Sequence, residues 1–212
     1  MPVELNVVDI WKSIQGEGPY VGRPAVFIRL SDCNLRCEFC DTDFLSTREK
    51  MFPEQVLAKV KDIAGKASLV VITGGEPFLQ DGVCDLAKLL VSHFLVQFET
   101  NGTIYPSALL PVACKVVCSP KPRVSVHEKW RFACTCLHKV NAWKYVVKAG
   151  KLSKDDIPEE TDPPPAGAVV YLQPMDERDE EKNRENIKAT VEACLRSGYL
   201  LSLQTHKIIG VV

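Results

Sequence analysis

The chain has 212 residues, 46% of them apolar and 25% charged, an ordinary balance for a globular protein with a substantial core. Its formal net charge of −1 excludes the strongly basic composition typical of nucleic-acid binding, and no apolar run is long enough to span a membrane. The first residues lack the layout of a secretion signal. We therefore expect a cytoplasmic protein with neither a nucleic acid nor a membrane as its partner.

Short apolar runs alternate with amphipathic segments along the chain, a pattern that favours a parallel α/β fold. In chain order, strands are predicted at 25–30, 69–73, 95–100, 115–118, 142–147, 169–173 and 200–204. Their nearly continuous apolar character is typical of strands covered on both faces. Helices are predicted at 53–64, near 82–93 and near 180–197.

Each predicted helix has one apolar side. In the first two helices these sides are formed by Val56, Leu57, Val60, Ile63 and Ala64, and by Leu86, Leu89 and Leu90. The third carries Ile187, Val191 and Leu195 at spacings of four and is expected to end at Gly198.

With about seven strands and only three clear helices, the pattern predicts an α/β fold of the abbreviated, partly open (β/α) barrel type. We expect about six or seven parallel strands and about three main helices. The polar, proline-rich segment 151–166 is typical of an interdomain linker or a long surface loop. We favour the loop, because strand and helix signals on both sides continue one sheet. The chain is therefore expected to form a single domain, 1–212.

Cysteine usage gives the clearest chemical signal. The chain has nine cysteines, and in a reducing compartment clustered cysteines are more often metal ligands than disulfides. Residues 33–43 read CNLRCEFCDTD, which sets Cys33, Cys37 and Cys40 at C-x3-C-x2-C with no fourth cysteine close by. A structural zinc site is closed by four protein ligands. Three thiolates can instead hold three irons of a [4Fe–4S] cluster and leave the fourth iron for a small molecule.

A second group of metal-binding residue types lies at 127–138. His127, Cys134, Cys136 and His138 imitate another metal site, but their spacing lacks the C-x2-C pair of most zinc sites. We interpret these cysteines as ordinary loop or buried thiols.

A glycine pair follows the second predicted strand. Residues 70–80 read VVITGGEPFLQ, so Gly74, Gly75 and Glu76 come directly after an apolar run. Glycines here let the backbone approach a ligand closely, and strand carboxyl ends are where α/β sheets bind ligands. A plain strand-to-helix turn is the alternative, which the nearby cysteine loop makes less attractive.

Together the two motifs resemble the radical S-adenosylmethionine superfamily. The resemblance implies that the open iron binds the amino and carboxylate groups of S-adenosylmethionine. An electron from the cluster then breaks the C5′–S bond and gives a 5′-deoxyadenosyl radical. The protein positions the cofactor and protects the radical.

Further motifs resemble one family of that superfamily, the 7-carboxy-7-deazaguanine synthases. They span nearly the whole chain: SIQGEG at 13–18, IRL at 28–30, ETNGT at 99–103, SPK at 119–121, QPMD at 173–176 and QTHKIIGVV at 204–212. Most lie at or just beyond strand ends, so one mouth of the barrel is expected to collect them.

The resemblance implies a carbon–nitrogen lyase that converts 6-carboxy-5,6,7,8-tetrahydropterin to 7-carboxy-7-deazaguanine, on the path to queuosine and related deazapurines. Hydrogen abstraction from C6 of the pterin starts the reaction. The substrate radical rearranges, recovers a hydrogen to regenerate the cofactor, and eliminates ammonia. The resemblance also implies a [4Fe–4S] cluster, S-adenosylmethionine and Mg2+ as cofactors, an electron donor such as flavodoxin, and a homodimer.

Site residues follow from the same resemblance. Cluster binding is assigned to Cys33, Cys37 and Cys40, Mg2+ binding to Thr42, and catalysis to Glu17 and His206. Cofactor binding is assigned to Phe39, Cys40, Asp41, Gly75, Glu76, Ser119, Pro120, Lys121, Gln173, Pro174, Met175 and Asp176. Substrate binding is assigned to Ile14, Gln15, Gly16, Arg29, Thr73, Glu99, Asn101 and Val212. Phe39 stands where the family often has tryptophan, and an aromatic ring there still allows stacking.

Several assignments also have chemical support of their own. Arg29 offers a planar fork for a carboxylate, and Thr42 offers the oxygen that Mg2+ prefers. Alone, Thr42 is typical of a turn and His206 of a hydrogen-bonded structural histidine; the surrounding motifs favour the functional interpretation. The terminal carboxylate of Val212 is expected to bind the guanidine-like edge of the pterin, the alternative being a frayed tail.

Two other interpretations stay open. A small radical activase, which makes a glycyl radical on a protein partner, would share the two cofactor motifs but should not need QGEG or QTHK. A non-enzymatic iron–sulfur or zinc module would not cleave S-adenosylmethionine. Pale, zinc-containing protein after anaerobic purification would favour the module, whereas brown protein that cleaves S-adenosylmethionine would exclude it.

Overall fold

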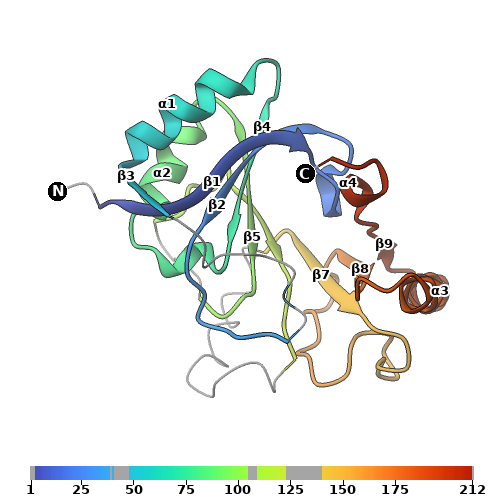
Figure 1. The fold of residues 1–212 in the computed structure, drawn as a ribbon. Coiled ribbons are helices and arrows are strands. Elements are labelled where there is room, and N and C mark those ends of the chain that lie inside the picture. The colour runs from blue at the N-terminus through green and yellow to red at the C-terminus, as the bar shows by residue number, and fades with distance from the viewer. Residues whose placement is uncertain (1–2, 39, 41–47, 105–108, 123–139, 212) are drawn as a thin grey trace.

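The computed structural model describes residues 3–38, 40, 48–104, 109–122 and 140–211, which form one nine-stranded sheet (Figure 1). The strand order is β3-β1-β2-β4-β5-β6-β7-β8-β9. The strands are β1 (Leu5–Ile14), β2 (Pro24–Leu30), β3 (Glu49–Met51), β4 (Leu69–Gly74), β5 (Leu95–Thr100), β6 (Lys115–Cys118), β7 (Ala142–Val147), β8 (Val170–Pro174) and β9 (Leu200–Leu201). The helices are α1 (Pro53–Ala64), α2 (Val83–Leu90), α3 (Glu180–Ser197) and α4 (Thr205–Ile208), with short 3-10 turns η1 (Gly18–Tyr20) and η2 (Pro77–Leu79). None of the helices described is long and apolar enough to cross a membrane.

The prediction of an abbreviated, partly open barrel is confirmed. Strands β2 and β4 to β9 pair in parallel, and α1, α2 and α3 lie where the sequence predicts the three main helices. The strand order runs from β3 at one edge to β9 at the other without closing. The last strand is shorter than predicted, because only Leu200–Leu201 pair with β8.

Sequence analysis missed β1 and β3, the two antiparallel strands. In β1 the buried side chains are Leu5, Val7 and Ile10, so the alternation breaks after Val7. The register with β2 shifts between Val7 and Asp9, as at a β-bulge. An inserted residue moves every later side chain to the other face. Strict alternation, the pattern sought in a half-buried strand, is therefore absent.

The two halves of the sheet have separate apolar cores. In the first half, α1 and α2 cover β1, β2, β4 and β5, and the side chains between them include Ile28, Val56, Ile72, Leu86 and Phe98. In the second half, a smaller core of Trp143, Tyr145 and Leu172 packs against Ala193 of α3 and Ile157 of segment 151–166. Figure 1 shows α1 and α2 together on one side and α3 on the other. Because Ile157 is buried, the proline-rich segment packs on the core as a surface loop.

The buried face of α3 differs from the prediction. Ile187 and Leu195 are 43% and 80% exposed, whereas Asn186, Thr190 and Ala193 are buried. Asn186 accepts a hydrogen bond from the Ala149 amide at 2.8 Å and donates one to the Met175 carbonyl at 3.0 Å. The helix thus turns a polar side inward to satisfy backbone groups at the ends of β7 and β8. Of the predicted apolar side, Ile187 and Leu195 face solvent and Val191 is half-buried.

The loop after β1 bridges the open side of the barrel. The Gly18 amide donates to Ser202 Oγ at 2.9 Å, and the Thr205 amide donates to the Gly16 carbonyl at 3.0 Å. Figure 1 shows the end of β1 beside α4 and the C-terminal end. The QGEG and QTHK motifs, nearly 190 residues apart in sequence, are therefore neighbours in the fold.

Candidate active site

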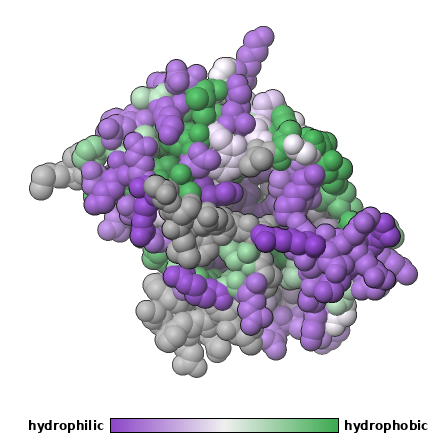
Figure 2. Space-filling model, viewed as in Figure 1, coloured by the Kyte–Doolittle hydropathy of each residue, from purple (hydrophilic) through white to green (hydrophobic). Residues whose placement is uncertain are grey.

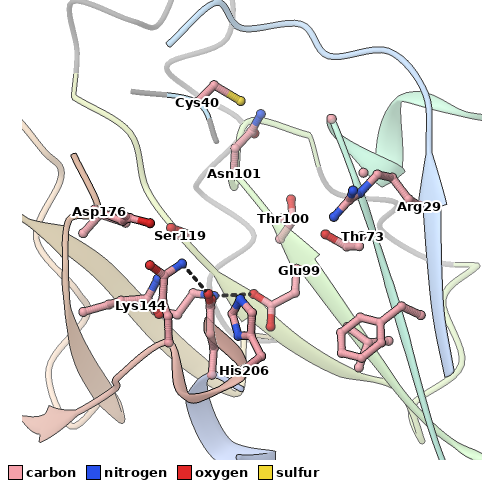
Figure 3. Close-up of a pocket in the computed structure, with 18 of the residues that line it drawn as sticks. Arg29, Cys40, Thr73, Glu99, Thr100, Asn101, Ser119, Lys144, Asp176 and His206 are labelled. Atoms are coloured by element: carbon pink, nitrogen blue, oxygen red, sulfur yellow. Dashed lines mark hydrogen bonds and ion pairs between the residues drawn. The ribbon is translucent and has the colours of Figure 1, made fainter. Parts of the chain in front are cut away.

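A cavity of about 540 Å³ lies at the carboxyl ends of the parallel strands, a size typical of small-molecule sites (Figure 3). Many residues singled out from the sequence line it: Ile14, Gln15, Glu17, Arg29, Cys33, Cys37, Cys40, Thr73, Gly75, Glu99, Asn101, Ser119, Lys121, Gln173, Pro174, Met175, Asp176 and His206. Gly16, Glu76 and Pro120 are not among the lining residues. This arrangement agrees with the expectation that one mouth of the barrel collects the motifs.

Several expectations fall outside the described residues. These are the roles of Phe39, Asp41, Thr42 and Val212. The second cysteine and histidine group at 127–138 lies outside them as well. These expectations stay predictions.

The three motif cysteines border the same cavity. The Leu35 amide donates to Cys33 Sγ at 3.4 Å, and the Asn101 side-chain amide approaches the same sulfur at 3.9 Å. Burial raises the pKa of the Cys33 thiol, and the neighbouring Cys37 and Cys40 raise it further. Three thiols that border one cavity, with N–H groups directed at a sulfur, fit an iron–sulfur cluster. In the described part of the chain, no group of three or more His, Cys, Asp or Glu side chains is arranged to hold a single metal ion.

The glycine pair lets the end of β4 lie against the cysteine loop. A Cβ atom at Gly75 would come within 2.1 Å of the Asp32 carbonyl oxygen and 2.7 Å of Cys33 Cβ. A Cβ atom at Gly74 would come within 2.2 Å of the Leu30 carbonyl oxygen. The Glu76 amide donates to the Asp32 carbonyl at 2.9 Å. Both glycines are therefore required by backbone packing inside the protein, in addition to any approach of a ligand.

The carboxylate of Glu76 points into the protein. It accepts hydrogen bonds from the Thr100 hydroxyl at 2.8 Å, the Asn101 amide at 2.8 Å and the Phe78 amide at 3.1 Å. The residue is fully buried, and burial raises the pKa of its carboxyl from 4.5 to about 7. The family resemblance implies that this acid contacts the cofactor; in the structure it ties the β4 turn to the end of β5.

An amide network continues from Glu76 to the cysteine loop. The Asn101 side chain donates to Asn34 Oδ1 at 3.1 Å, and Asn34 donates to Thr103 Oγ1 at 2.8 Å. Thr103 in turn donates to Asn101 Oδ1 at 2.6 Å. The ETNGT motif thereby supports the cysteine loop as well as the cavity wall.

Residues after β6 and β8 form another wall. Lys121 Nζ donates to Ser119 Oγ at 2.9 Å, and Lys207 of α4 pairs with Asp176 at 2.7 Å. Hydrogen bonds from the Lys207 ammonium, the Arg178 amide and the Asn183 side chain hold the pKa of Asp176 well below its usual range. Cationic and anionic groups alternate here, which suits a ligand that carries both charges.

Lys144 on β7 lies between two glutamates. It forms ion pairs with Glu17 and, at 3.0 Å, with Glu99, and its side chain is only 7% exposed (Figure 3). Gln204 donates to the other Glu17 oxygen at 2.9 Å, and Gln97 donates to the other Glu99 oxygen at 2.6 Å. The result is a buried group with two carboxylates, one ammonium and two amides.

The two glutamates titrate differently. Burial alone would raise the pKa of Glu17, but the charge and hydrogen bond of Lys144, with help from Gln204 and His206, lower it to about 2. Burial raises the pKa of Glu99, an effect that Lys144 opposes and the Glu17 charge reinforces. The two carboxylates raise the pKa of Lys144 despite its burial.

Arg29 lies on a different part of the cavity wall. Its guanidinium stacks over the Trp11 ring at 4.8 Å, and its buried Nε has no hydrogen-bond partner among the residues that the structure describes. An unsatisfied buried donor is costly unless something accepts from it. A guanidinium that borders a cavity with a free donor is suited to bind an anion.

Gly16 positions His206 even though it does not line the cavity. A Cβ atom at Gly16 would come within 2.0 Å of His206 Nδ1 and 2.8 Å of the His206 amide nitrogen. The Gly16 carbonyl accepts from both the amide and the hydroxyl of Thr205. Only a glycine lets the loop after β1 approach α4 so closely.

Sequence analysis missed Lys144. The signal was available, because Lys144 is the only charged residue in the apolar strand AWKYVV. A lysine inside a buried strand needs a paired anion. The anions come from β5 and from the loop after β1, and the sequence alone does not reveal that these segments meet β7.

Comparisons with known proteins agree with the geometry. The Radical SAM superfamily matches residues 28–112, which include the cysteine loop and the glycine pair. A 7-carboxy-7-deazaguanine synthase of Rickettsia prowazekii (strain Madrid E) is 42% identical over 214 residues, which cover 98% of this chain and 89% of that protein. The one from Rhodospirillum rubrum is 34% identical over 224 residues, covering 98% and 92%.

A solved structure shares the fold. The crystal structure of QueE from Escherichia coli superposes with a TM-score of 0.69 and 24% sequence identity. The match covers 94% of this chain and 93% of that one. At this identity the likeness concerns the fold, and the family assignment depends on the sequence relatives.

Proposed function

Because the chain belongs to the 7-carboxy-7-deazaguanine synthase family of radical S-adenosylmethionine enzymes, we propose that its cavity has a cofactor end and a substrate end. The enzyme contracts the ring of 6-carboxy-5,6,7,8-tetrahydropterin to give 7-carboxy-7-deazaguanine with loss of ammonia, in queuosine biosynthesis. The cofactor end comprises Cys33, Cys37, Cys40 and the turn after β4. The substrate end comprises Arg29, Glu17, Glu99, Lys144 and His206. Figure 3 shows Cys40 and Asn101 at one end and Glu99, Lys144 and His206 at the other.

At the cofactor end, the cysteine loop holds the [4Fe–4S] cluster that leaves one iron open for S-adenosylmethionine. When bound, these cofactors supply the radical that abstracts hydrogen from the pterin. Ser119, Lys121 and Asp176 border the same space and offer a hydroxyl, an ammonium and a carboxylate to S-adenosylmethionine. Gly75 and Glu76 act mainly by keeping the β4 turn against the cysteine loop.

At the substrate end, opposite charges match the two sides of the pterin. The substrate has a carboxylate on C6 and a guanidine-like edge of N–H donors on its pyrimidine ring. Arg29, whose buried Nε lacks a partner in the described part of the chain, is suited to the carboxylate. Glu17 and Glu99 have acceptor oxygens suited to the N–H edge. This pairing of an anion site with an acceptor pair is the observation that carries the residue assignments.

The reaction itself has a direct test. Anaerobic protein with reconstituted cluster, S-adenosylmethionine and a strong reductant should convert 6-carboxy-5,6,7,8-tetrahydropterin to a product with the mass of 7-carboxy-7-deazaguanine. Cleavage of S-adenosylmethionine without that product, but with a radical on an added protein, would support the activase alternative.

Arg29→Lys tests the carboxylate assignment. Lysine keeps the charge but loses the planar fork and the stacking on Trp11, so KM for the pterin should rise by about tenfold or more. Arg23→Lys is the matched control, because Arg23 also lies over an aromatic ring, that of Tyr20, but does not border the cavity. Equal KM values for the two variants would contradict the assignment.

Mg2+, the electron donor and the location belong to the same proposal. We propose that Thr42 contributes to a Mg2+ site beside the cluster, since it follows Cys40 by two residues and Mg2+ prefers oxygen ligands. An external donor such as flavodoxin would reduce the cluster, and a reducing cytoplasm suits cysteines that must stay free. We treat residues 1–212 as one domain because the strands from both halves join a single sheet.

A homodimer is proposed from the surface of the C-terminal part. Exposed apolar side chains follow one another along α3, β9 and α4, namely Ile187, Leu195, Leu200, Leu201, Ile208 and Ile209. Figure 2 shows apolar residues gathered over the side where α4 and the C-terminal end lie. Such a concentration is typical of an interface.

Leu195→Glu should reduce the dimer fraction measured by light scattering after size exclusion, because a buried charge opposes association. Val112→Glu is the control, since Val112 is 98% exposed and lies far along the chain from this surface. A monomeric wild type would contradict the proposed dimer.

A further inference from the structure

Lys144 has no role in the reaction as described so far, although it occupies the centre of the substrate end. It is buried on β7 and pairs with one carboxylate from the loop after β1 and one from β5. If these two acids only had to be hydrogen-bonded within the protein, they could be protonated, or amides could stand in their place, and neutral donors would satisfy them. A buried ammonium between two glutamates therefore needs an explanation.

We propose that Lys144 is a positioning residue that keeps Glu17 and Glu99 both ionised and side by side, as paired acceptors for the N–H edge of the substrate. This inference rests on the proposed substrate end. It assigns to Lys144 control over the charge state of the two acceptors, while Glu17 and Glu99 themselves contact the pterin.

The hydrogen-bond pattern supports a pair that accepts. Lys144 donates to one oxygen of Glu17 and one oxygen of Glu99. The remaining oxygens accept from Gln204 at 2.9 Å and from Gln97 at 2.6 Å. An ionised carboxylate has about four lone-pair positions and no donor, so each glutamate keeps spare capacity to accept. In each of these hydrogen bonds the glutamate oxygen is the acceptor. This pattern favours two ionised carboxylates over a pair in which one glutamate is a carboxylic acid.

Charge explains why a lysine is needed. Two carboxylates in one buried site raise each other's pKa until one of them holds a proton. The Lys144 ammonium reduces the net charge of the group from −2 to −1 and favours the ionised form of both acids. At Glu17 it outweighs burial and lowers the pKa, and at Glu99 it opposes the rise in pKa that burial causes. Without it, one carboxyl would become a donor and would face the N–H edge of the pterin with the wrong polarity.

Other charged groups face the same cavity and remain in any Lys144 variant. His206 of α4 lies close enough to Glu17 to lower the pKa of that carboxyl. Arg29 on β2, Lys121 after β6, and the Asp176–Lys207 pair also line the cavity. A comparison of variant with wild type cancels their contributions, since they are common to both proteins.

The test measures binding of 6-carboxypterin, the oxidised and unreactive form of the substrate, to cluster-loaded protein with S-adenosylmethionine. Lys144→Met should bind at least about tenfold more weakly than wild type near pH 6. Its affinity should recover as the pH rises, because the shared proton leaves the glutamate pair. In the wild type the corresponding inflection should lie at lower pH. Iron content and S-adenosylmethionine affinity should not change.

Lys148→Met is the matched control. Lys148 follows β7 by one residue and pairs with Glu177 at 2.8 Å, but its side chain is 47% exposed and lies outside the cavity. This variant should bind 6-carboxypterin as the wild type does at every pH. An affinity loss as large as that of Lys144→Met would overturn the proposal.

A double variant, Lys144→Met with Glu99→Gln, separates charge from packing and guards against misfolding. The amide does not titrate and removes the repulsion, so the additional pH dependence of Lys144→Met should disappear. A pH-independent loss in Lys144→Met, or a pH dependence that survives in the double variant, would overturn the role of Lys144. If the wild type itself fails to bind 6-carboxypterin, the proposed substrate is wrong, which is a different outcome.

Discussion

The two ends of the cavity hold buried carboxylates in opposite ways. At the cofactor end, Glu76 is bonded by a hydroxyl and two backbone amides, all uncharged donors, and its carboxyl pKa rises to about 7. At the substrate end, the Lys144 ammonium outweighs burial and lowers the pKa of Glu17 to about 2. An acid that serves as a structural link can be neutral. Acids that must accept from a ligand need a permanent counterion.

The surrounding structure follows the same division. The cofactor end joins the cysteine loop after β2 to the turn after β4 and the end of β5, next to the core that α1 and α2 cover, and at Gly74 and Gly75 backbone packs directly against backbone. The substrate end brings together β7, α4 and the loop after β1 through side-chain ion pairs and amides. The first arrangement resists any added volume. The second depends on charge.

Gly75→Ala should have the largest effect, because it adds volume where backbone meets backbone. The new Cβ would lie 2.1 Å from the Asp32 carbonyl oxygen, and Gly75 has no positive φ that could cause strain by itself. We expect loss of about 1–3 kcal/mol in the free energy of unfolding. Iron after anaerobic reconstitution should fall toward the level of Cys40→Ala, because the cysteine loop must shift.

Gly150→Ala is the matched control for that variant. Gly150 has φ of +73°, but a Cβ there meets no heavy atom within 4 Å. It should cost about 1–2 kcal/mol through the left-handed backbone alone and leave the iron content unchanged. Full iron in Gly75→Ala would show that the cysteine loop tolerates the added atom.

Glu76→Gln tests whether the carboxyl at the cofactor end is neutral near neutral pH. Its folded pKa of about 7 lies above the ordinary 4.5, so the folded state binds the extra proton between these values. Stability from this group is therefore complete below about pH 4.5 and is lost as the pH rises through about 7, by up to about 3 kcal/mol. Urea unfolding at several pH values should show this loss in the wild type.

The glutamine variant should lack that pH-dependent component, because an amide does not titrate. It should also be less stable below pH 7 by about 1–3 kcal/mol, since its NH2 group meets one of the three donors. A wild type whose stability rises with pH across this range would mean that Glu76 is ionised, and the contrast between the two ends would then fail.

The cofactor end was more predictable from sequence than the substrate end, for a physical reason. Its cysteines lie within eight residues, and its glycine pair directly follows a strand, so local pattern and strand order are enough. The bridge between Gly16 and Thr205 joins residues 189 apart, and Lys144 pairs with Glu17 of the same loop, which is 127 residues away in sequence. The bulge in β1 and the polar inner side of α3 were missed because each breaks the expected apolar period, and α3 does so to satisfy backbone groups after β7 and β8.

Lys207→Met should have the smallest effect. It tests how far the substrate end, which depends on charge, extends along the cavity wall. Lys207 pairs with Asp176 at 2.7 Å, but the two side chains are 36% and 25% exposed, so solvent screens the interaction. Asp176 also accepts from the Asn183 side chain and the Arg178 amide, each at 2.9 Å, and these contacts remain in the variant. We expect a loss below about 1 kcal/mol in the free energy of unfolding, reduced further by salt.

The affinity of Lys207→Met for S-adenosylmethionine, measured by equilibrium binding to cluster-loaded protein, should change by less than about threefold. The depressed pKa of Asp176 makes its contribution to stability present near neutral pH and lost on acidification, so the comparison belongs at pH 7 and above. A tenfold or larger loss of affinity would mean that the Lys207 ammonium contacts the ligand directly. The substrate end and the wall formed by β8 and α4 would then be one charged surface. The boundary between the cofactor end and the substrate end would in that case lie between β5 and β6.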